Sequence, residues 1–277
     1  GAWPFVTLRY FEHELGHHHV YAARPHRKGL RRCGPWGRQL GLSLRHVRRW
    51  AFLPRRLNWW IGVIFACGAS LFAIGSVLSL WPALAEAMGL KPEHVNAVFF
   101  AGSIPFTTAA YLQLFQAANM PRDHAPSATS DRRRWRLFGW FPSHPGWLSC
   151  ALQFPGTVLF NFNTFDAMIP GLNWFETEMA VWVPNLIGSI LFLASGWLAW
   201  VETCHAHFAW RPCRLSWQIA FWNLMGCLSF MAAALFAIVL PVSLDGEVWR
   251  PVLATSFTLS GGVCFFIGSV LMLPEDA

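Results

Sequence analysis

Six long apolar stretches constrain this chain more than any other feature. They run over residues 57–82, 94–118, 147–169, 179–201, 216–241 and 250–273, and each has at least the roughly 20 residues that a helix needs to cross a bilayer. Of the 277 residues, 55% are hydrophobic and only 13% are charged, against about 25% charged in an ordinary soluble domain. The sequence therefore predicts an all-α polytopic membrane protein with six transmembrane helices.

Every apolar stretch also contains a Gly that is followed four residues later by a Phe. Positions four and seven residues apart lie on one helix face, and a small residue also follows seven positions after the Gly in five of the six stretches. Small residues let helix backbones approach closely in lipid. We predict that the helices form three related hairpins that pack through Gly68, Phe72, Gly102, Phe106, Gly156, Phe160, Gly188, Phe192, Gly226, Phe230, Gly262 and Phe266.

The cations are distributed unevenly around the predicted spans. Twelve Lys and Arg precede the first span, five lie in 119–146 and two in 202–215, whereas the segments on the opposite side carry only Lys91 and Arg250. An excess of Lys and Arg marks the cytoplasmic side. We therefore expect a membrane protein with both termini in the cytoplasm. The net charge of +7 is explained by this topology and by attraction to anionic lipids. Nucleic acid is not an expected partner, because no recognition motif accompanies the charge.

The chain divides into a basic arm, 1–56, and a transmembrane domain, 57–277. The arm ends in a segment that mixes Arg with Trp50, Phe52 and Leu53, as interfacial segments do. We expect this cytoplasmic arm to dock on the membrane or on another protein. Membrane lipids and other membrane-protein subunits are the expected partners.

Polar amides and Trp residues also follow a pattern. Gln153, Asn185 and Asn223 each precede by three residues the Gly of their stretch, and amides in hydrocarbon normally hydrogen-bond to other helices. The seventeen Trp collect near the predicted membrane interfaces, as aromatic belts do. A lipid or an isoprenoid is the kind of cofactor that such a belt could hold, and zinc is not expected.

Several stretches resemble a bacterial membrane family. They begin with the hairpin segments 58–72, 100–103 and 110–114, and continue with Gln153–Phe165, Gly188–Phe192, Ser195–Glu202 and Gly268–Glu275. This part of the chain, about 57–275, resembles the YrhK-like membrane domain and the larger uncharacterised bacterial proteins that carry it. The resemblance implies a helical membrane domain in the bacterial cytoplasmic (inner) membrane and brings no biochemical activity. The basic arm lies outside it.

Two groups of residues match metal-binding patterns. The segment His13-Glu-Leu-Gly-His17 matches H-E-x-x-H, in which two His share a zinc on a helix while Glu14 acts as general base. It resembles the first motif of site-2-type intramembrane metalloproteases, whose third ligand would correspond to Asp245 in a Leu-Asp-Gly sequence. By the predicted topology, however, Asp245 and His13 lie on opposite sides of the membrane. The His-rich composition of this segment is the alternative explanation.

The second group consists of Cys204 and His207 with Cys213 nearby. Thiolates and imidazoles suit zinc, but the spacing lacks the paired arrangement of ordinary zinc modules. Ordinary residues at a helix end are the alternative explanation. The candidate metal ligands are therefore His13, His17, Cys204 and His207.

Three functional hypotheses remain at this stage. The leading one is a non-catalytic scaffold or accessory subunit of a larger membrane assembly. The alternative is a carrier of a small solute or lipid, because Pro105, Pro155 and Pro184 can break helices beside glycines. Asp166 and Glu202 are the carrier's candidate buried charges, and neither has an obvious opposite charge within the membrane. The third hypothesis is a zinc-dependent metalloprotease that uses the motif at 13–17.

Overall fold

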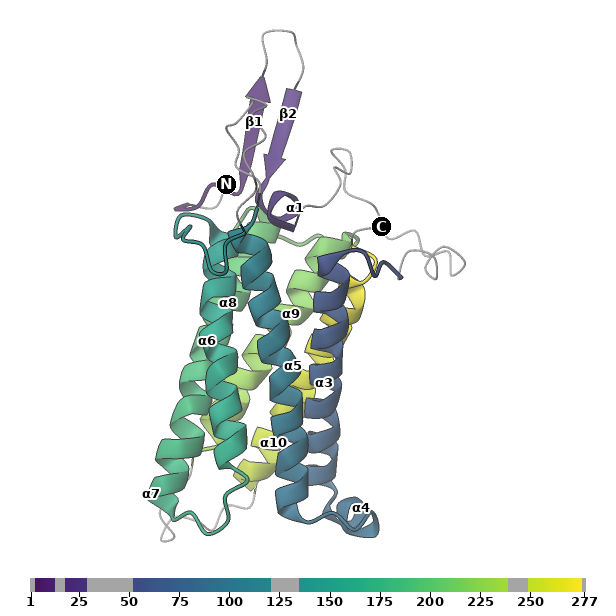
Figure 1. Ribbon diagram of the computed structural model, residues 1–277, viewed down its shortest axis with the longest axis vertical. Helices are drawn as coiled ribbons and strands as arrows, with labels where there is room; N and C mark the ends of the chain where they lie inside the picture. The colour runs from purple at the N-terminus through teal and green to yellow at the C-terminus, as the bar shows by residue number, and fades with distance from the viewer. Residues whose placement is uncertain (1–2, 13–17, 29–51, 121–134, 239–248, 276–277) are drawn as a thin grey trace.

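The structure is a computed structural model that describes residues 3–12, 18–28, 52–120, 135–238 and 249–275. Six long helices stand side by side along its long axis (Figure 1). They are α3 (Leu57–Leu80), α5 (Pro92–Ala118), α6 (Pro145–Asp166), α8 (Val183–Cys204), α9 (Leu215–Phe236) and α10 (Trp249–Met272). The helices begin and end within a few residues of the predicted apolar stretches. Shorter elements are α1 (Ala23–Lys28), α4 (Pro82–Ala87), α7 (Trp174–Thr177) and the π-helical turn η1 (Glu178–Trp182), which joins α7 to α8.

Five helical segments of the described chain are long and apolar enough to cross a membrane. They are α3, α5, the continuous run Trp174–Cys204, α9 and α10. The helix α6 is not among them, and its 22 residues include Gln153, Asn161, Asn163 and Asp166. The structure therefore supports a membrane protein. The sixth span stays a prediction.

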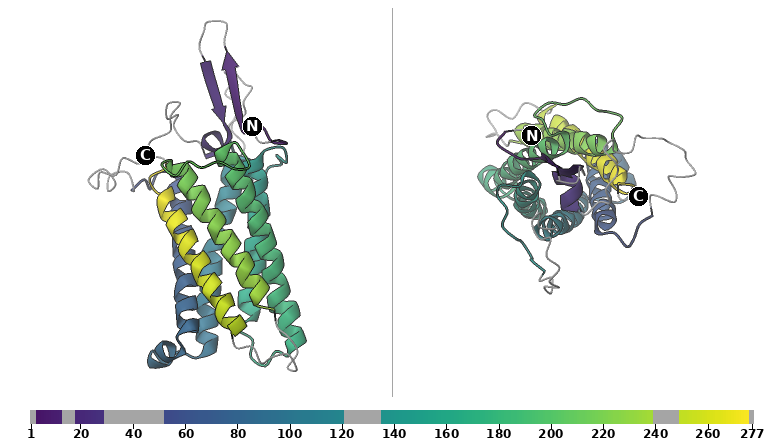
Figure 2. Two further views of the ribbon diagram at one scale, coloured as in Figure 1. Left: turned by 180° about the vertical axis from the view of Figure 1, so that it is seen from behind. Right: turned by 90° about the horizontal axis from the view of Figure 1, so that it is seen from above.

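The long helices form a ring in which each packs against two others, in the order α3, α5, α6, α8, α9, α10 and back to α3. Seen from above, α1 lies over the middle of this ring (Figure 2). Three neighbouring pairs, α3 with α5, α6 with α8, and α9 with α10, are also consecutive long helices in the chain. The residues that face the axis of the ring therefore come from all parts of the sequence.

Glycines and phenylalanines make reciprocal contacts within these three pairs. A Cβ atom added to Gly68 would lie 2.6 Å from Phe106, and one added to Gly102 would lie 3.0 Å from Phe72. The other two helix pairs show the same reciprocal contacts. Between α6 and α8, Gly156 faces Phe192 and Gly188 faces Phe160. Between α9 and α10, Gly226 faces Phe265 and Gly261 faces Phe230. Each Gly therefore leaves the space that the aromatic ring of the paired helix occupies.

The prediction for the sixth stretch was wrong by one residue. Phe266 is 41% exposed, whereas its neighbour Phe265 is 3% exposed and packs against the ring of Phe230. Gly262 is a packing residue, but it faces the backbone of α3 at Ala69 and Ala73. Gly261 and Phe265 keep the same spacing of four and take the expected place on α10.

Six phenylalanines meet near the axis and fill the middle of the ring. All are at most 5% exposed, and the pairs within the three helix pairs have ring centroids 5.0 to 5.2 Å apart. Further contacts connect the pairs to one another, with centroids of Phe106 and Phe265 5.7 Å apart and those of Phe160 and Phe230 5.7 Å apart. Tilted and edge-to-face rings at these distances attract one another. We call Phe72, Phe106, Phe160, Phe192, Phe230 and Phe265 the phenylalanine cluster.

Hydroxyl groups, rather than the predicted amides, connect the helices. Thr164 of α6 donates to Ser103 of α5 at 3.2 Å, and Ser149 of α6 lies 3.1 Å from Ser195 of α8. In the described part of the chain, the side-chain amides of Gln153, Asn185 and Asn223 make no hydrogen bonds. The expectation that these three amides hold helices together was therefore wrong.

The arm contains a β-hairpin, which corrects the all-α prediction. Strands β1 (Leu8–Glu12) and β2 (His18–Ala22) pair antiparallel, with Leu8 opposite Ala22 and Glu12 opposite His18. The hairpin extends beyond the end of the ring at which α1 lies, and α4 lies at the other end (Figure 1). Strands of five residues show little periodicity in a sequence, which explains why the hairpin was not predicted.

We expect Gly68→Ala to destabilise the protein by about 1–3 kcal/mol, because overpacking a tight contact costs about that much. Besides meeting Phe106, its new methyl group would lie 2.8 Å from the carbonyl oxygen of Gly102, which is backbone and cannot swing away. Gly268→Ala is the matched control, since the nearest atoms there lie 3.6 Å from the new group. Thermal unfolding in detergent measures both, and equal midpoints would contradict the packing argument.

Candidate functional site

The short helix α1 brings three cations to one end of the ring. Arg24, Arg27 and Lys28 follow the spacing i, i+3 and i+4, which places them on one helix face. All three are buried, with side chains at most 7% exposed. Buried charges are expensive unless they are paired, so this face of α1 requires acidic partners.

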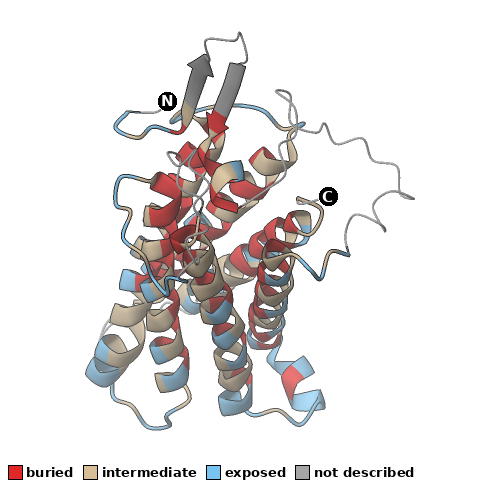
Figure 3. Ribbon diagram, turned by 45° about the horizontal axis from the view of Figure 1, so that its top comes forward, coloured by how far each residue is buried: buried red, intermediate tan, exposed pale blue. Residues whose placement is uncertain are grey.

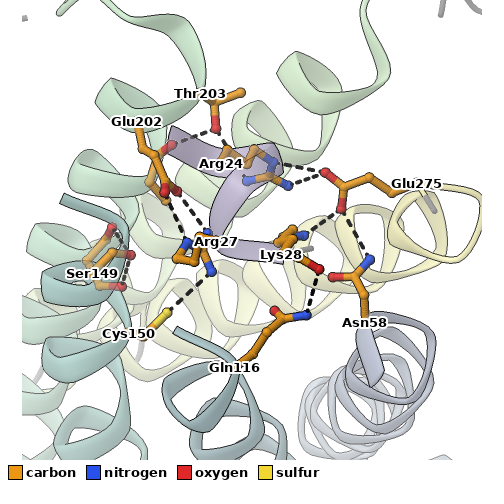
Figure 4. Close-up of polar contacts among 12 residues, drawn as sticks. Arg24, Arg27, Lys28, Asn58, Gln116, Ser149, Cys150, Glu202, Thr203 and Glu275 are labelled. Carbon is orange, nitrogen blue, oxygen red and sulfur yellow. Dashed lines mark hydrogen bonds and ion pairs between the residues drawn. The ribbon is translucent and has the colours of Figure 1, made fainter. Parts of the chain in front are cut away.

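Two carboxylates supply these partners, as Figure 4 shows. Arg27 donates twice to Glu202 of α8, from Nε at 3.0 Å and from Nη2 at 2.8 Å. Arg24 pairs with Glu275 at 2.9 Å, and Lys28 pairs with the other oxygen of Glu275 at 2.5 Å. We call Arg24, Arg27, Lys28, Glu202 and Glu275 the ion-pair cluster. The two-pronged contact of Arg27 is the strongest geometry available to an arginine and a carboxylate.

Polar groups from the surrounding helices complete the contacts of α1. Arg24 donates to the hydroxyl of Thr203 at 3.3 Å, and Arg27 points Nη1 at the sulfur of Cys150 on α6 at 3.7 Å. Gln116 of α5 donates to the carbonyl oxygen of Lys28 at 3.5 Å, and Asn58 of α3 donates to Glu275 at 3.4 Å. The helix α1 is therefore joined directly to α5, α6 and α8 and to Glu275 after α10, and α3 reaches it only through Glu275. Figure 3 shows the buried residues of α1 and of the neighbouring helix ends at this position.

A glycine makes room for the central ion pair. A Cβ atom at Gly146, in the first turn of α6, would collide with the carboxylate of Glu202 and with Nε of Arg27. Glu202 lies in the last turn of α8, where the carbonyl groups at a helix C-terminus favour nearby cations. The local structure of α6 and α8 thus fits the guanidinium group of Arg27.

These contacts bear on two expectations. Glu202 was expected to have no obvious opposite charge within the membrane, and its partner is Arg27 of the arm, which lies 175 residues earlier in the chain. The arm was expected to dock on the membrane or on another protein. Its helix α1 docks on the chain's own helices, whereas residues 29–51 of the arm lie outside the described part. Asp166, the other candidate buried charge, is the last residue of α6 and is only partly buried.

The predicted metal ligands are not brought together within the described residues. His13 and His17 lie outside them, and the described residues on either side, Glu12 and His18, are paired in strands. Cys204 is buried beside Trp200 and Trp217. His207 contacts the carbonyl oxygen of Trp3 at 3.1 Å and stacks on Trp197. In the described segments, no group of three or more His, Cys, Asp or Glu side chains could hold a metal ion.

The charges of the ion-pair cluster do not balance, because three cations face two carboxylates. Burial alone would raise the pKa of Glu275, but Arg24 and Lys28 more than offset this and lower it to about 2. Burial and the nearby Arg24 lower the pKa of Lys28 to about 8, although Glu275 acts in the opposite direction. Burial also opposes the charge of Arg27, but Glu202 outweighs it, so the pKa of Arg27 is raised. The cluster therefore carries one excess positive charge, and burial with Arg24 disfavours the protonated form of Lys28.

We expect Glu202→Gln to weaken the docking of α1 by about 3–5 kcal/mol, because it leaves the buried charge of Arg27 without its partner. Trypsin should then cleave after Arg27 or Lys28 faster than in the wild type. Glu93→Gln is the control, because Glu93 is exposed and lies 4.0 Å from Lys91, and such surface pairs contribute at most about 1 kcal/mol. Equal cleavage rates in the two variants would contradict the assigned role of Glu202.

Stability should rise with pH in two separate windows. The folded-state pKa of Glu275, about 2, lies below its ordinary value of 4.5, so its contribution is complete above pH 4.5 and is lost as the pH falls toward 2. The folded-state pKa of Lys28, about 8, lies below its ordinary value of 10.5. Between these values the unfolded chain binds more protons, so stability rises with pH. Thermal unfolding against pH measures both effects.

Two variants separate these windows. Glu275→Gln should remove the acid dependence, and Lys28→Met should remove the alkaline one. A pH profile that is the same in the wild type and in both variants would show that other groups control it.

The comparisons with known proteins add no relative. No protein-family model, curated protein or solved structure matches the chain. The YrhK-like assignment therefore stays a prediction based on resemblance. The function has to be argued from the geometry of the ring, its interior and the docked helix α1.

Proposed function

We propose that this chain is a non-catalytic carrier of a small solute across the bacterial cytoplasmic membrane. In this proposal all six long helices span the membrane, both termini lie in the cytoplasm, and α1 closes the cytoplasmic end of the ring. The distribution of Lys and Arg supports this orientation, because the end at which α1 lies receives the basic segments of the sequence.

A cavity on the axis of the ring is the observation that carries the proposal. Its volume is about 150 Å³ and all six long helices line it, so it lies inside the ring. Its lining residues are Phe72, Phe99, Phe160, Asn163, Thr164, Asn185, Phe230, Ala233, Thr255 and Thr258. We call it the axial cavity.

The lining residues place the axial cavity in the half of the ring away from α1. Phe99 and Asn185 lie near the starts of α5 and α8, and Asn163 and Ala233 lie near the ends of α6 and α9. The phenylalanine cluster contributes three of its members to the lining and separates the cavity from α1. Proline also lies close by, since Pro184 precedes Asn185 in the first turn of α8. The breaks expected at the prolines are not observed, because α5 continues through Pro105, α6 continues through Pro155, and Pro184 lies within the continuous run Trp174–Cys204. The support for a carrier therefore comes from the cavity and not from broken helices.

Two barriers in series then lie between the axial cavity and the cytoplasm. The first is the phenylalanine cluster, whose rings fill the middle of the ring of helices. The second is α1, held by the ion-pair cluster. A carrier that exposes its site to one side at a time needs closure of this kind on the opposite side. The docked α1 also removes a reason to require a separate partner for the arm.

The accessory-subunit function is a second candidate, favoured by the β-hairpin of the arm. A two-stranded sheet is marginally stable alone, and the outer edges of β1 and β2, which pair with no other described strand, can pair with a strand of another protein. The hairpin β1–β2 projects beyond the ring (Figure 1). A partner chain would therefore meet it without disturbing α1. The metalloprotease stays the third proposal, and it rests on the motif at 13–17 alone.

Solute permeability of reconstituted vesicles tests the carrier. Vesicles that contain the protein should swell faster in iso-osmotic glycerol than protein-free vesicles, as measured by stopped-flow light scattering. Glu202→Gln weakens one barrier and Phe192→Ala weakens the other, since Phe192 is 1% exposed within the phenylalanine cluster. Because the barriers act in series, the double variant should be several-fold more permeable than either single variant.

The control is Glu93→Gln, which should swell like the wild type. Swelling at the rate of protein-free vesicles in the wild type and in all variants would contradict the carrier. In that case the accessory function becomes the leading proposal. Native mass spectrometry of protein extracted in mild detergent would then reveal a second subunit at a fixed ratio, or its absence would exclude a stable partner.

A further inference from the structure

We infer that the axial cavity binds a small uncharged solute that offers both hydrogen-bond donors and acceptors. The inference concerns the binding site itself. It rests on the proposed function only in the clause that this solute is the transported one.

Three polar side chains face the axial cavity with hydrogen-bonding capacity that the described chain does not use. They are Asn163 of α6, Asn185 of α8 and Thr255 of α10, and none of them hydrogen-bonds to another described residue. Asn163 is only 7% exposed. Buried polar groups are almost always paired, so an amide that is buried against a cavity and lacks a partner points to a ligand or to water.

The two remaining hydroxyl groups of the lining are already engaged. Thr164 donates to the carbonyl oxygen of Phe160 at 2.6 Å, and Thr258 donates to that of Ala254 at 2.9 Å. These two groups hold their own helices and can still accept a hydrogen bond from a ligand. The site therefore has amide donors, amide acceptors and hydroxyl oxygens arranged around one space.

The lining defines the chemical class of the ligand. It contains no Asp, Glu, Lys, Arg or His, so an ion bound there would lose its water without gaining an opposite charge, which is strongly unfavourable. The rings of Phe72, Phe160 and Phe230 line the apolar part of the cavity. An uncharged molecule that combines carbon with hydroxyl or amide groups satisfies both parts of the lining.

The volume limits the size of the ligand. The cavity of about 150 Å³ is well above the roughly 10–15 Å³ that one water molecule needs, and below the roughly 300–1,000 Å³ of sites for drug-sized ligands. A small polyol or a small amide fits this range. Contacts to Asn163, Asn185 and Thr255 would join helices of two different pairs around the ligand.

Ligand-observed NMR tests this site independently of transport. The aromatic protons of the detergent-solubilised protein are saturated, and transfer of saturation is measured to four probes. These are glycerol and acetamide, which are uncharged, and methylammonium and acetate, which are ions. We expect transfer to glycerol and acetamide and much weaker transfer to the two ions. Stronger transfer to either ion would overturn the uncharged class.

Matched variants assign the signal to the axial cavity. Thr255→Val removes one hydroxyl and keeps the shape of the side chain, and Asn163→Leu removes the buried amide; each should reduce transfer to glycerol several-fold. Thr108→Val is the control, because Thr108 is exposed on α5 and its hydroxyl bonds within its own helix at 3.0 Å. Transfer that is unchanged in Thr255→Val, or absent in the wild type, would overturn the site. If Asn163→Leu does not fold, Thr255→Val decides the outcome alone.

The binding and swelling experiments can fail separately. Cavity-dependent transfer to glycerol with impermeable vesicles would support the site and contradict the carrier. Permeable vesicles whose glycerol signal does not depend on Thr255 would support the carrier and overturn this site.

Discussion

The structure depends on the reciprocal fit of glycine and phenylalanine within each pair of neighbouring helices. In a bilayer the lipid chains are as apolar as the helix surfaces, so helices associate through close contact rather than through the hydrophobic effect. Gly68 and Gly102 allow α3 and α5 to approach, and Phe72 and Phe106 fill the space that the opposite Gly leaves. Three such pairs direct six rings toward one axis. The filled middle separates the interior into two ends with different chemistry, the axial cavity on one side and the ion-pair cluster on the other.

Much of the helical architecture could be predicted, because hydropathy and the spacing of four residues depend on local sequence. The sequence of α10 shows where this information ends. Gly261 with Phe265 and Gly262 with Phe266 have identical spacing, and adjacent residues differ by about 100° around a helix. Only the neighbours distinguish them, since Gly261 faces Phe230 of α9 while Gly262 faces the backbone of α3. The β-hairpin was missed because its two strands are short and gain their order from pairing with each other.

The candidate site depends on contacts between distant parts of the chain, which a single sequence does not reveal. Glu202 could be recognised as a buried acid, but Arg27 lies in an arm that was treated as a separate domain. A usable signal was present, because Arg24, Arg27 and Lys28 share one helix face and the topology places the arm on the side of Glu202 and Glu275. Cations and carboxylates that the topology places on the same side of the membrane would have been expected to pair with one another. The amides were misassigned for a related reason. Asn185 lines the axial cavity, and both a cavity lining and a contact between helices place a polar group inside a bundle, so only its neighbours separate the two.

The nature of the contact that holds α1 bears on what this end of the ring does. Apolar side chains of similar volume hold a buried segment as well as an ion pair does or better, because the charges must first lose their water. The ion-pair cluster retains three cations and two carboxylates at this position, and its one excess positive charge opposes docking further. Ion pairs hold α1 on the ring only while each charged group has its partner. Water or a competing charge can replace any of these partners. A permanent cap would gain from apolar contacts, whereas a segment that docks and leaves again requires contacts of comparable strength in both states. The chemistry of the ion-pair cluster therefore favours an end of the ring that opens and closes.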